Sequence, residues 1–110
     1  MKGKAGMVLY GLKNCDTCRK ALKALPNAEF VDVSGGPVPE PVMDRALQAF
    51  GDTVLNTRST TWRGLTASER AQEPKDLLQA HPKLMKRPLI VDGTDLYLGW
   101  TRDTQAALLG

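Results

Sequence analysis

The chain has 110 residues, of which 42% are hydrophobic and 25% charged, and its formal net charge is +3 at pH 7. This size suits one globular domain with a buried core and is too small for two. Because no run of five or more like charges occurs, we expect an anionic small molecule, not a nucleic acid, as the partner.

Membrane and secretory signals are missing from the pattern of apolar residues. No apolar run approaches the roughly 18 residues that a membrane span needs. The basic residues 1–6 precede only three apolar residues before Tyr10, too few for a signal peptide. We therefore expect a cytoplasmic protein without membrane contact.

Two cysteines and the single histidine, His81, are also too few for a closed zinc site, which needs about four ligands.

The first third of the chain predicts a strand–helix–strand unit. Residues 7–10 are an apolar strand that Gly11 ends. Residues 15–25 have helical period, with Cys18, Ala21, Leu22 and Leu25 on one face. Residues 29–33 alternate apolar and polar side chains and predict a second strand. This is a βαβ opening.

The middle of the chain predicts helices separated by breaks. Glycines and prolines interrupt residues 34–41, and Pro41 suits the first turn of a helix. We expect residues 52–65 to be a loop. Thr66 and Glu69 have capping-box spacing for a short helix before Pro74, and residues 75–79 predict another, ended by His81 and Pro82. The apolar face of the helix after Pro41 is expected from Val42, Ala46, Leu47 and Phe50.

The last part of the chain predicts two more strands and a helix. Residues 89–91 and 96–98 are apolar and flank a turn at residues 92–95. Thr101 is placed to cap a terminal helix that reaches Leu109. The whole order predicts an α/β fold, a mixed four-stranded sheet flanked by helices. We expect a single domain over residues 1–110 with a helical insert at about 39–82.

Both cysteines lie in one tetrapeptide, Cys15-Asp16-Thr17-Cys18, at the predicted start of the first helix. Backbone N–H groups at a helix start favour a thiolate, and Lys13 and Arg19 are candidate cations beside it. Cys15 is therefore the expected nucleophile. Cys18 begins the apolar face, so it is either a resolving thiol or a core residue. In a reducing compartment such a pair is more typical of catalysis than of a structural disulfide.

Two further segments carry candidate site residues. Pro88 opens the third strand, where a proline invites a turn or a cis bond and leaves neighbouring backbone groups free for a substrate; a simple chain reversal is the alternative. Residues 55–65 hold Arg58, Arg63, Trp62 and four hydroxyl residues, without an acidic residue. Arginines suit carboxylate or oxyanion recognition, although solvated surface arginines are also common. Trp62 and Trp100 are expected as packing anchors.

Residues 10–22, 55–63 and 86–91, taken in this order, resemble the arsenate-reductase-related (ArsC) family. The resemblance extends from about residue 8 to 109 and is to the YffB-like branch, and more distantly to the Spx regulators. It implies a thioredoxin-like fold with an inserted helical region. By position, Cys15 matches the family's nucleophilic cysteine and Arg58 and Arg87 match two arginines around the oxyanion. Pro88 matches the cis-proline that faces the cysteine.

The resemblance also implies a function. The YffB-like branch implies a glutathione-dependent thiol reductase, in which Cys15 attacks and either Cys18 or glutathione resolves. Glutathione would then be a co-substrate, glutaredoxin is a candidate partner, and no bound cofactor or metal is expected. The alternatives are an arsenate reductase, although its third arginine has no clean match here, and an Spx-like regulator that binds RNA polymerase. Expected substrate contacts are Lys13, Asn14, Thr17, Arg19, Trp62, Arg63 and Pro88.

Overall fold

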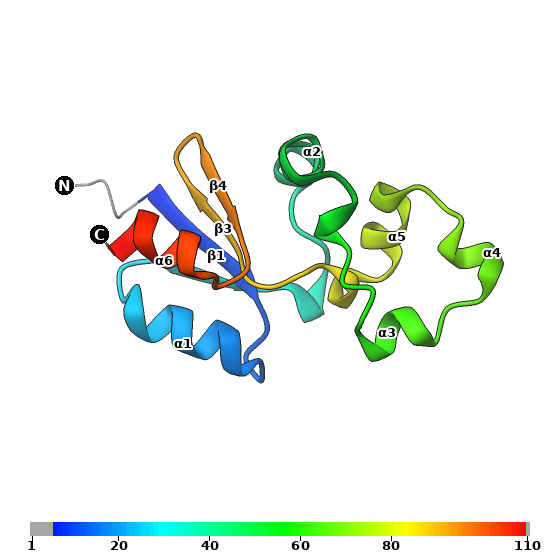
Figure 1. The fold of residues 1–110 in the computed structure, drawn as a ribbon, viewed down its shortest axis with the longest axis horizontal. Helices are drawn as coiled ribbons and strands as arrows, with labels where there is room; N and C mark the ends of the chain where they lie inside the picture. Colours follow the sequence, from blue (N-terminus) through cyan, green and yellow to red (C-terminus); the bar gives the residue numbers. More distant parts are fainter. Residues whose placement is uncertain (1–5, 110) are drawn as a thin grey trace. The chain divides into compact units, whose positions relative to one another are not determined.

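The computed structural model describes residues 6–109, which form two compact units (Figure 1). We call residues 6–32 and 87–109 the sheet unit, and Val33–Lys86 the helical unit. The expected insert, at about 39–82, lies inside the helical unit. That the two units act as a single domain stays a prediction.

The sheet unit is built on four strands, β1 (Met7–Gly11), β2 (Glu29–Asp32), β3 (Leu89–Asp92) and β4 (Asp95–Leu98). Their order in the sheet is β2-β1-β3-β4. β1 runs parallel to β2 and antiparallel to β3, and β4 is antiparallel to β3. The predicted mixed four-stranded sheet is therefore confirmed, and β1 is one of its two central strands.

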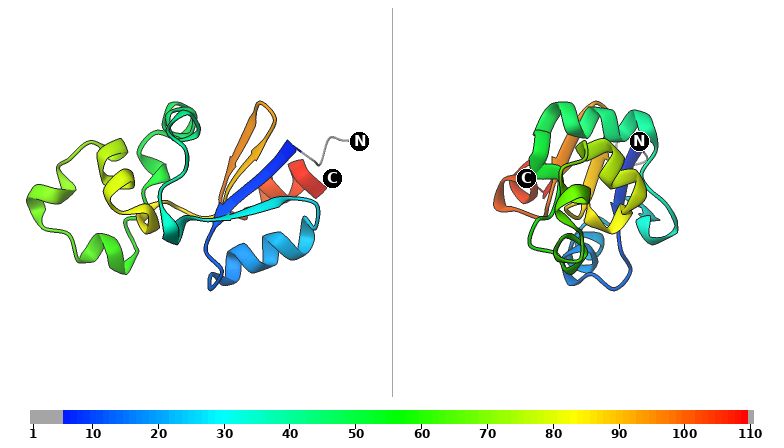
Figure 2. Two further views of the ribbon diagram at one scale, coloured as in Figure 1. Left: turned by 180° about the vertical axis from the view of Figure 1, so that it is seen from behind. Right: turned by 90° about the vertical axis from the view of Figure 1, so that its right-hand side faces the viewer.

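Two helices, α1 (Asp16–Ala24) and α6 (Arg102–Leu109), cover one face of this sheet (Figures 1 and 2). Side chains alternate along a strand, so Met7 and Leu9 share this face, and the register places Leu9 opposite Ile90. The core on this face is completed from the helices by Ala21, Leu25 and Leu108. The βαβ opening and the ββα close give the predicted thioredoxin-like fold.

Local signals in the sequence explain several boundaries of the sheet unit. Gly93 has a φ of 62° in the β3–β4 turn, a left-handed conformation that favours glycine. The Thr101 hydroxyl accepts a hydrogen bond from the Thr104 N–H at 3.1 Å, which confirms it as the cap of α6. Trp100 packs against the core, as expected. The second strand, however, ends at Asp32, because Val33 already begins a 3-10 turn.

The helical unit contains α2 (Glu40–Phe50), α3 (Thr60–Arg63), α4 (Ala67–Arg70) and α5 (Pro74–Ala80). Three 3-10 turns accompany them: η2 (Val33–Gly35), η3 (Gly51–Val54) and η4 (Pro82–Leu84). Pro41 lies in the first turn of α2, as predicted. The buried side chains of this helix are Met43 and Ala46, so the core face is rotated from the expected one, whose other members are half-buried.

The expectation that residues 52–65 form a loop is wrong, because η3 and α3 occupy much of this stretch. A helix of four residues is too short to show helical period in the sequence. Its caps are nevertheless present: the Ser59 hydroxyl accepts a hydrogen bond from the Trp62 N–H at 3.2 Å. The predicted capping box of Thr66 and Glu69 is confirmed at the start of α4.

Across the helical unit, Lys75 of α5 contacts two carboxylates of α2. Its Nζ lies 2.6 Å from Glu40 Oε2 and 3.0 Å from Asp44 Oδ1.

None of the helices within residues 6–109 has both the length and the apolar character needed to cross a bilayer.

The core of the sheet unit predicts a sharp contrast between two leucines. Leu9 is fully buried, whereas 52% of Leu109 is exposed. Leu9→Ala should therefore lower the free energy of unfolding by about 2–5 kcal/mol, because it removes packed methyl groups and leaves a cavity. Leu109→Ala should change it by less than about 0.5 kcal/mol. Urea unfolding of both variants measures the difference; equal losses would contradict this account of the core.

Candidate functional site

The candidate site of the sheet unit lies where β1 turns into α1. The Cys15 N–H donates to the Leu12 carbonyl at 3.3 Å, which closes this turn, and the Cys15 carbonyl accepts from the Arg19 N–H at 2.9 Å. Cys15 is the N-cap of α1, with extended backbone angles of −92° and 119°. Its half-buried sulfur therefore lies beside the unpaired N–H groups of a helix start.

The environment of Cys15 lowers the pKa of its thiol. Burial alone would raise this pKa, but three stabilising contacts outweigh it: the backbone N–H of Cys18, the Cys18 thiol, and the guanidinium of Arg87, by hydrogen bond and by charge. At neutral pH a lowered pKa increases the fraction of the reactive thiolate.

Cys18 has the opposite character. Its side chain is fully buried, as the sequence predicted. Burial is the largest effect on Cys18 and raises its pKa to about 11. The backbone hydrogen bond from Leu12 and the charge of Arg87 lower this pKa, while the hydrogen bond and the charge of Cys15 raise it. At neutral pH Cys18 is therefore a protonated thiol. It can donate its S–H to Cys15, and it does not compete with Cys15 as a nucleophile.

Gly11, the last residue of β1, touches this buried sulfur. A Cβ built on Gly11 would lie 2.5 Å from Cys18 Sγ and 3.3 Å from Cys18 Cβ. From the sequence, Gly11 is expected only to end the first strand. An isolated glycine at a strand end is a signal of close approach, and it could have indicated this contact.

Arg87 and Pro88 directly precede β3, the strand paired antiparallel with β1. Their peptide bond is cis, as the position of Pro88 suggested. Pro88 is buried, and its carbonyl accepts a hydrogen bond from the Gly99 N–H at 2.8 Å. The structure thus brings Arg87 to Cys15, while a contact of Pro88 with substrate stays a prediction.

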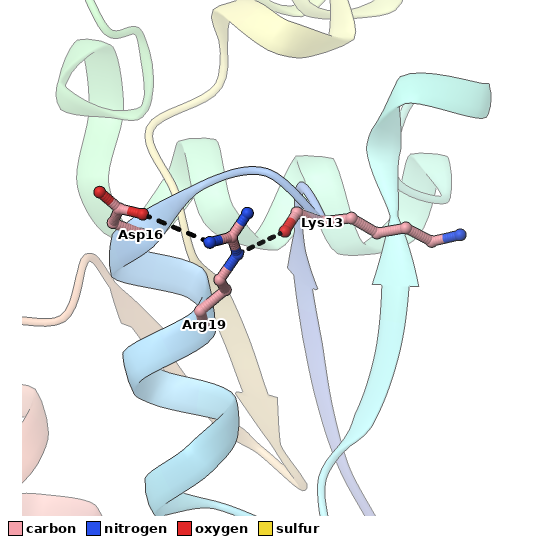
Figure 3. Close-up of polar contacts among 3 residues, drawn as sticks. All are labelled: Lys13, Asp16 and Arg19. Carbon is pink, nitrogen blue, oxygen red and sulfur yellow. Dashed lines mark hydrogen bonds and ion pairs between the residues drawn. The ribbon is translucent and has the colours of Figure 1, made fainter.

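The charged residues next to the cysteines have a different role from the expected one. The Arg19 Nε donates to the Lys13 carbonyl at 3.1 Å, and its Nη1 lies 3.7 Å from Asp16 Oδ1 (Figure 3). The Lys13 side chain points away from Arg19 (Figure 3). Arg19 therefore stabilises the turn before α1 through these two contacts. The cation that lowers the Cys15 pKa is Arg87. Substrate contacts of Lys13, Asn14, Thr17 and Arg19 stay predictions.

The second motif belongs to the helical unit. Asn56 Oδ1 accepts a hydrogen bond from the Arg58 N–H at 3.2 Å, and the Ser59 hydroxyl donates to the Asn56 carbonyl at 2.7 Å. These bonds shape the turn that enters α3 and leave the Arg58 side chain exposed. Trp62 and the exposed Arg63 follow on α3 itself. The expected roles of all three side chains toward a substrate stay predictions.

Arg70, which no motif in the sequence marks as a site residue, contacts the C-terminal end of α3. Its Nε donates to the Trp62 carbonyl and its Nη2 to the Arg63 carbonyl, each at 3.2 Å. Its guanidinium also lies 5.5 Å from the centroid of the Trp62 ring. A cation at a helix C-terminus satisfies carbonyls that have no partner within the helix. The Trp62 ring, which is expected to pack, therefore packs against the guanidinium of Arg70.

The residues that line a cavity of about 220 Å³ in the helical unit include Thr61, His81 and Lys83. Ser34 also lines it, and no carboxylate does. His81 ends α5, as expected. Within residues 6–109, no three His, Cys, Asp or Glu side chains gather as metal ligands.

The sequence profile of the ArsC family matches residues 10–108 of the chain. The chain belongs to the ArsC family. This match includes both cysteines, Arg58 and Arg87, so the two groups of candidate residues described above lie within the family region.

Three relatives resemble this ArsC-family chain over most of its length. An uncharacterized protein of Haemophilus influenzae is 33% identical, covering 92% of this chain and 97% of its own. A solved structure described as the YFFB protein is 32% identical with a TM-score of 0.83, covering 94% and 99%. The global transcriptional regulator Spx of Bacillus subtilis is 29% identical, covering 88% and 82%.

The contact between Arg87 and Cys15 predicts a shift in thiol reactivity. Arg87→Gln should raise the Cys15 pKa, because it removes the positive charge that stabilises the thiolate. The rate of alkylation follows the thiolate fraction, so its pH profile should move to higher pH. Arg87→Lys, which keeps a charge, should move it less, and Arg19→Gln is the matched control and should not move it. An unchanged profile in Arg87→Gln would show that Arg87 does not act on Cys15.

The contacts of Arg70 predict local opening of α3. In Arg70→Ala the amides of Arg63 and Gly64, which bond to Ser59 and Thr60, should exchange hydrogen faster. Arg58→Ala removes a nearby exposed arginine and should leave these two amides unchanged. Exchange measured by NMR separates the variants, and equal rates would refute a capping role for Arg70.

Proposed function

We propose that this ArsC-family protein is a thiol–disulfide oxidoreductase in which the Cys15 thiolate is the nucleophile and glutathione the co-substrate. The observation that carries the proposal is the asymmetry of the two thiols. Cys15 is half-buried with a lowered pKa, and Cys18 is buried with a raised one. One thiol is thereby prepared for attack and the other is kept protonated.

The proposed reaction has two exchange steps. In the first, the Cys15 thiolate attacks the glutathione sulfur of a mixed disulfide, a Cys15–glutathione disulfide forms, and the other thiolate leaves and takes a proton from solvent. In the second, a glutathione thiolate attacks this disulfide, which releases oxidised glutathione and restores the Cys15 thiolate. Arg87 stabilises the Cys15 thiolate before the attack and after its release.

A glutathionylated peptide tests the proposal. With glutathione present, the wild-type protein should release the free peptide, and Cys15→Ser should not, because the attacking sulfur is absent. Cys18→Ala should keep activity if glutathione resolves the intermediate, and lose it if Cys18 does. Mass spectrometry after exposure to oxidised glutathione should find the adduct on Cys15. No turnover would refute the proposal, and an ordinary Cys15 pKa, near 8.5, would remove the observation that carries it.

The same protein can be offered arsenate with glutathione and glutaredoxin. Membership of the ArsC family and the presence of Arg58 and Arg87 motivate this assay. Arsenate-dependent turnover that exceeds the turnover of the mixed disulfide would replace the proposed substrate class with an oxyanion. Its absence leaves the thiol reductase as the proposal.

The similarity to Spx supports a second candidate, a redox-sensing regulator that binds RNA polymerase. Here a peroxide would take two electrons and two protons from Cys15 and Cys18, which would form a disulfide. Pull-down with the polymerase α subunit, with and without the oxidant, tests this candidate, and Cys18→Ala is the control that cannot form the disulfide. Binding in neither state would exclude it.

A further inference from the structure

The end of β1 and the first turn of α1 meet at one point, where Gly11 faces Cys18. Gly11 follows Met7 and Leu9 by even steps, so it belongs to the sheet face that α1 covers. Cys18 lies on the buried side of α1. Its Sγ is so close to the Gly11 backbone that a Cβ on residue 11 would stand 2.5 Å away, far inside the contact distance of carbon and sulfur.

The glycine is needed here for space and not for its backbone angles. The φ of Gly11 is not positive, so another residue could adopt the same backbone. The tight turn from Leu12 to Cys15, closed at 3.3 Å, brings the helix start down onto the strand end. The Cys18 sulfur then fills the place that a side chain at residue 11 would take.

We propose that Gly11 is a positioning residue for the Cys15 nucleophile: its missing side chain leaves a notch that holds the Cys18 sulfur within reach of the Cys15 thiolate. One contact of the thiolate depends on the position of this sulfur, namely the hydrogen bond that the Cys18 thiol donates to Cys15. The backbone N–H of Cys18 stabilises the same thiolate separately from the sulfur. A side chain at residue 11 pushes Cys18 Sγ out of the notch, so the thiolate loses one of its donors.

The inference rests on the proposed function only where turnover is concerned. The pH profile of Cys15 alkylation reports the thiolate without any physiological substrate. A wild-type protein with a low Cys15 pKa and no turnover would refute the thiol reductase and leave the positioning role of Gly11 intact. Full turnover, together with a pH profile of Cys15 alkylation that does not change when residue 11 is substituted, would refute the positioning role of Gly11 and leave the thiol reductase intact.

The test is a cycle of variants at residues 11 and 18. Gly11→Ala should shift the alkylation profile to higher pH and slow alkylation severalfold at pH 7. Cys18→Ala should shift it in the same direction. Gly11→Ala combined with Cys18→Ala should give no shift beyond Cys18→Ala alone, because the sulfur is gone and the remaining 3.3 Å contact with the residue 18 Cβ needs only a small adjustment. Gly6→Ala, at a glycine with open space around it, is the matched control.

Each outcome of this cycle decides the matter. An unshifted profile in folded Gly11→Ala overturns the proposal, and so does a further shift in the double variant, which would mean that residue 11 acts independently of the sulfur. If Gly11→Ala fails to fold, thermal unfolding of the double variant replaces the profile. Restored folding there supports the notch, and continued failure overturns it.

Discussion

The chemistry of the sheet unit depends on how closely α1 approaches the end of β1. The hydrogen bond between Cys15 and Leu12 closes the turn, and the absence of a side chain at Gly11 lets the first helical turn settle onto the strand. This contact sets how close the two sulfurs lie to each other and to the start of α1. Arg87 lies just before the neighbouring strand β3, whose antiparallel pairing with β1 sets its position. The nucleophile is thus positioned by backbone packing from three elements.

The same close packing explains why two thiols in one tetrapeptide behave differently. A thiolate on Cys15 has the helix start and Arg87 beside it, whereas a thiolate on Cys18 would be buried next to another negative charge. Two anions so close together are unfavourable, so the pair keeps one proton over a wide pH range. The proton stays on Cys18, since burial disfavours the charged form there. The two ionisations therefore form one linked system.

The sequence predicts the elements of the sheet unit well because their signals are local. An apolar run ended by Gly11 reveals β1, alternation reveals β2, and helical period reveals α1. The positions of Pro88 and Thr101 indicate a turn or a cis bond and a helix cap. Contacts between distant residues are different. The action of Arg87 on Cys15 depends on strand pairing, and the capping of α3 by Arg70 depends on how two very short helices fold back. No periodicity marks such contacts, so α3 and its cap could not be predicted from local pattern.

The insertion of the helical unit between β2 and β3 has a consequence for synthesis on the ribosome. Val33–Lys86 is continuous in the chain, so all of its internal contacts are available before β3 is made. The sheet unit, in contrast, is split, and the pairing of β1 with β3 must wait until Leu89–Asp92 have been made. Closing so long a loop is entropically costly and slow. Until that pairing forms, Cys15 lacks Arg87, so the lowered pKa of its thiol is reached only after β3 has been made.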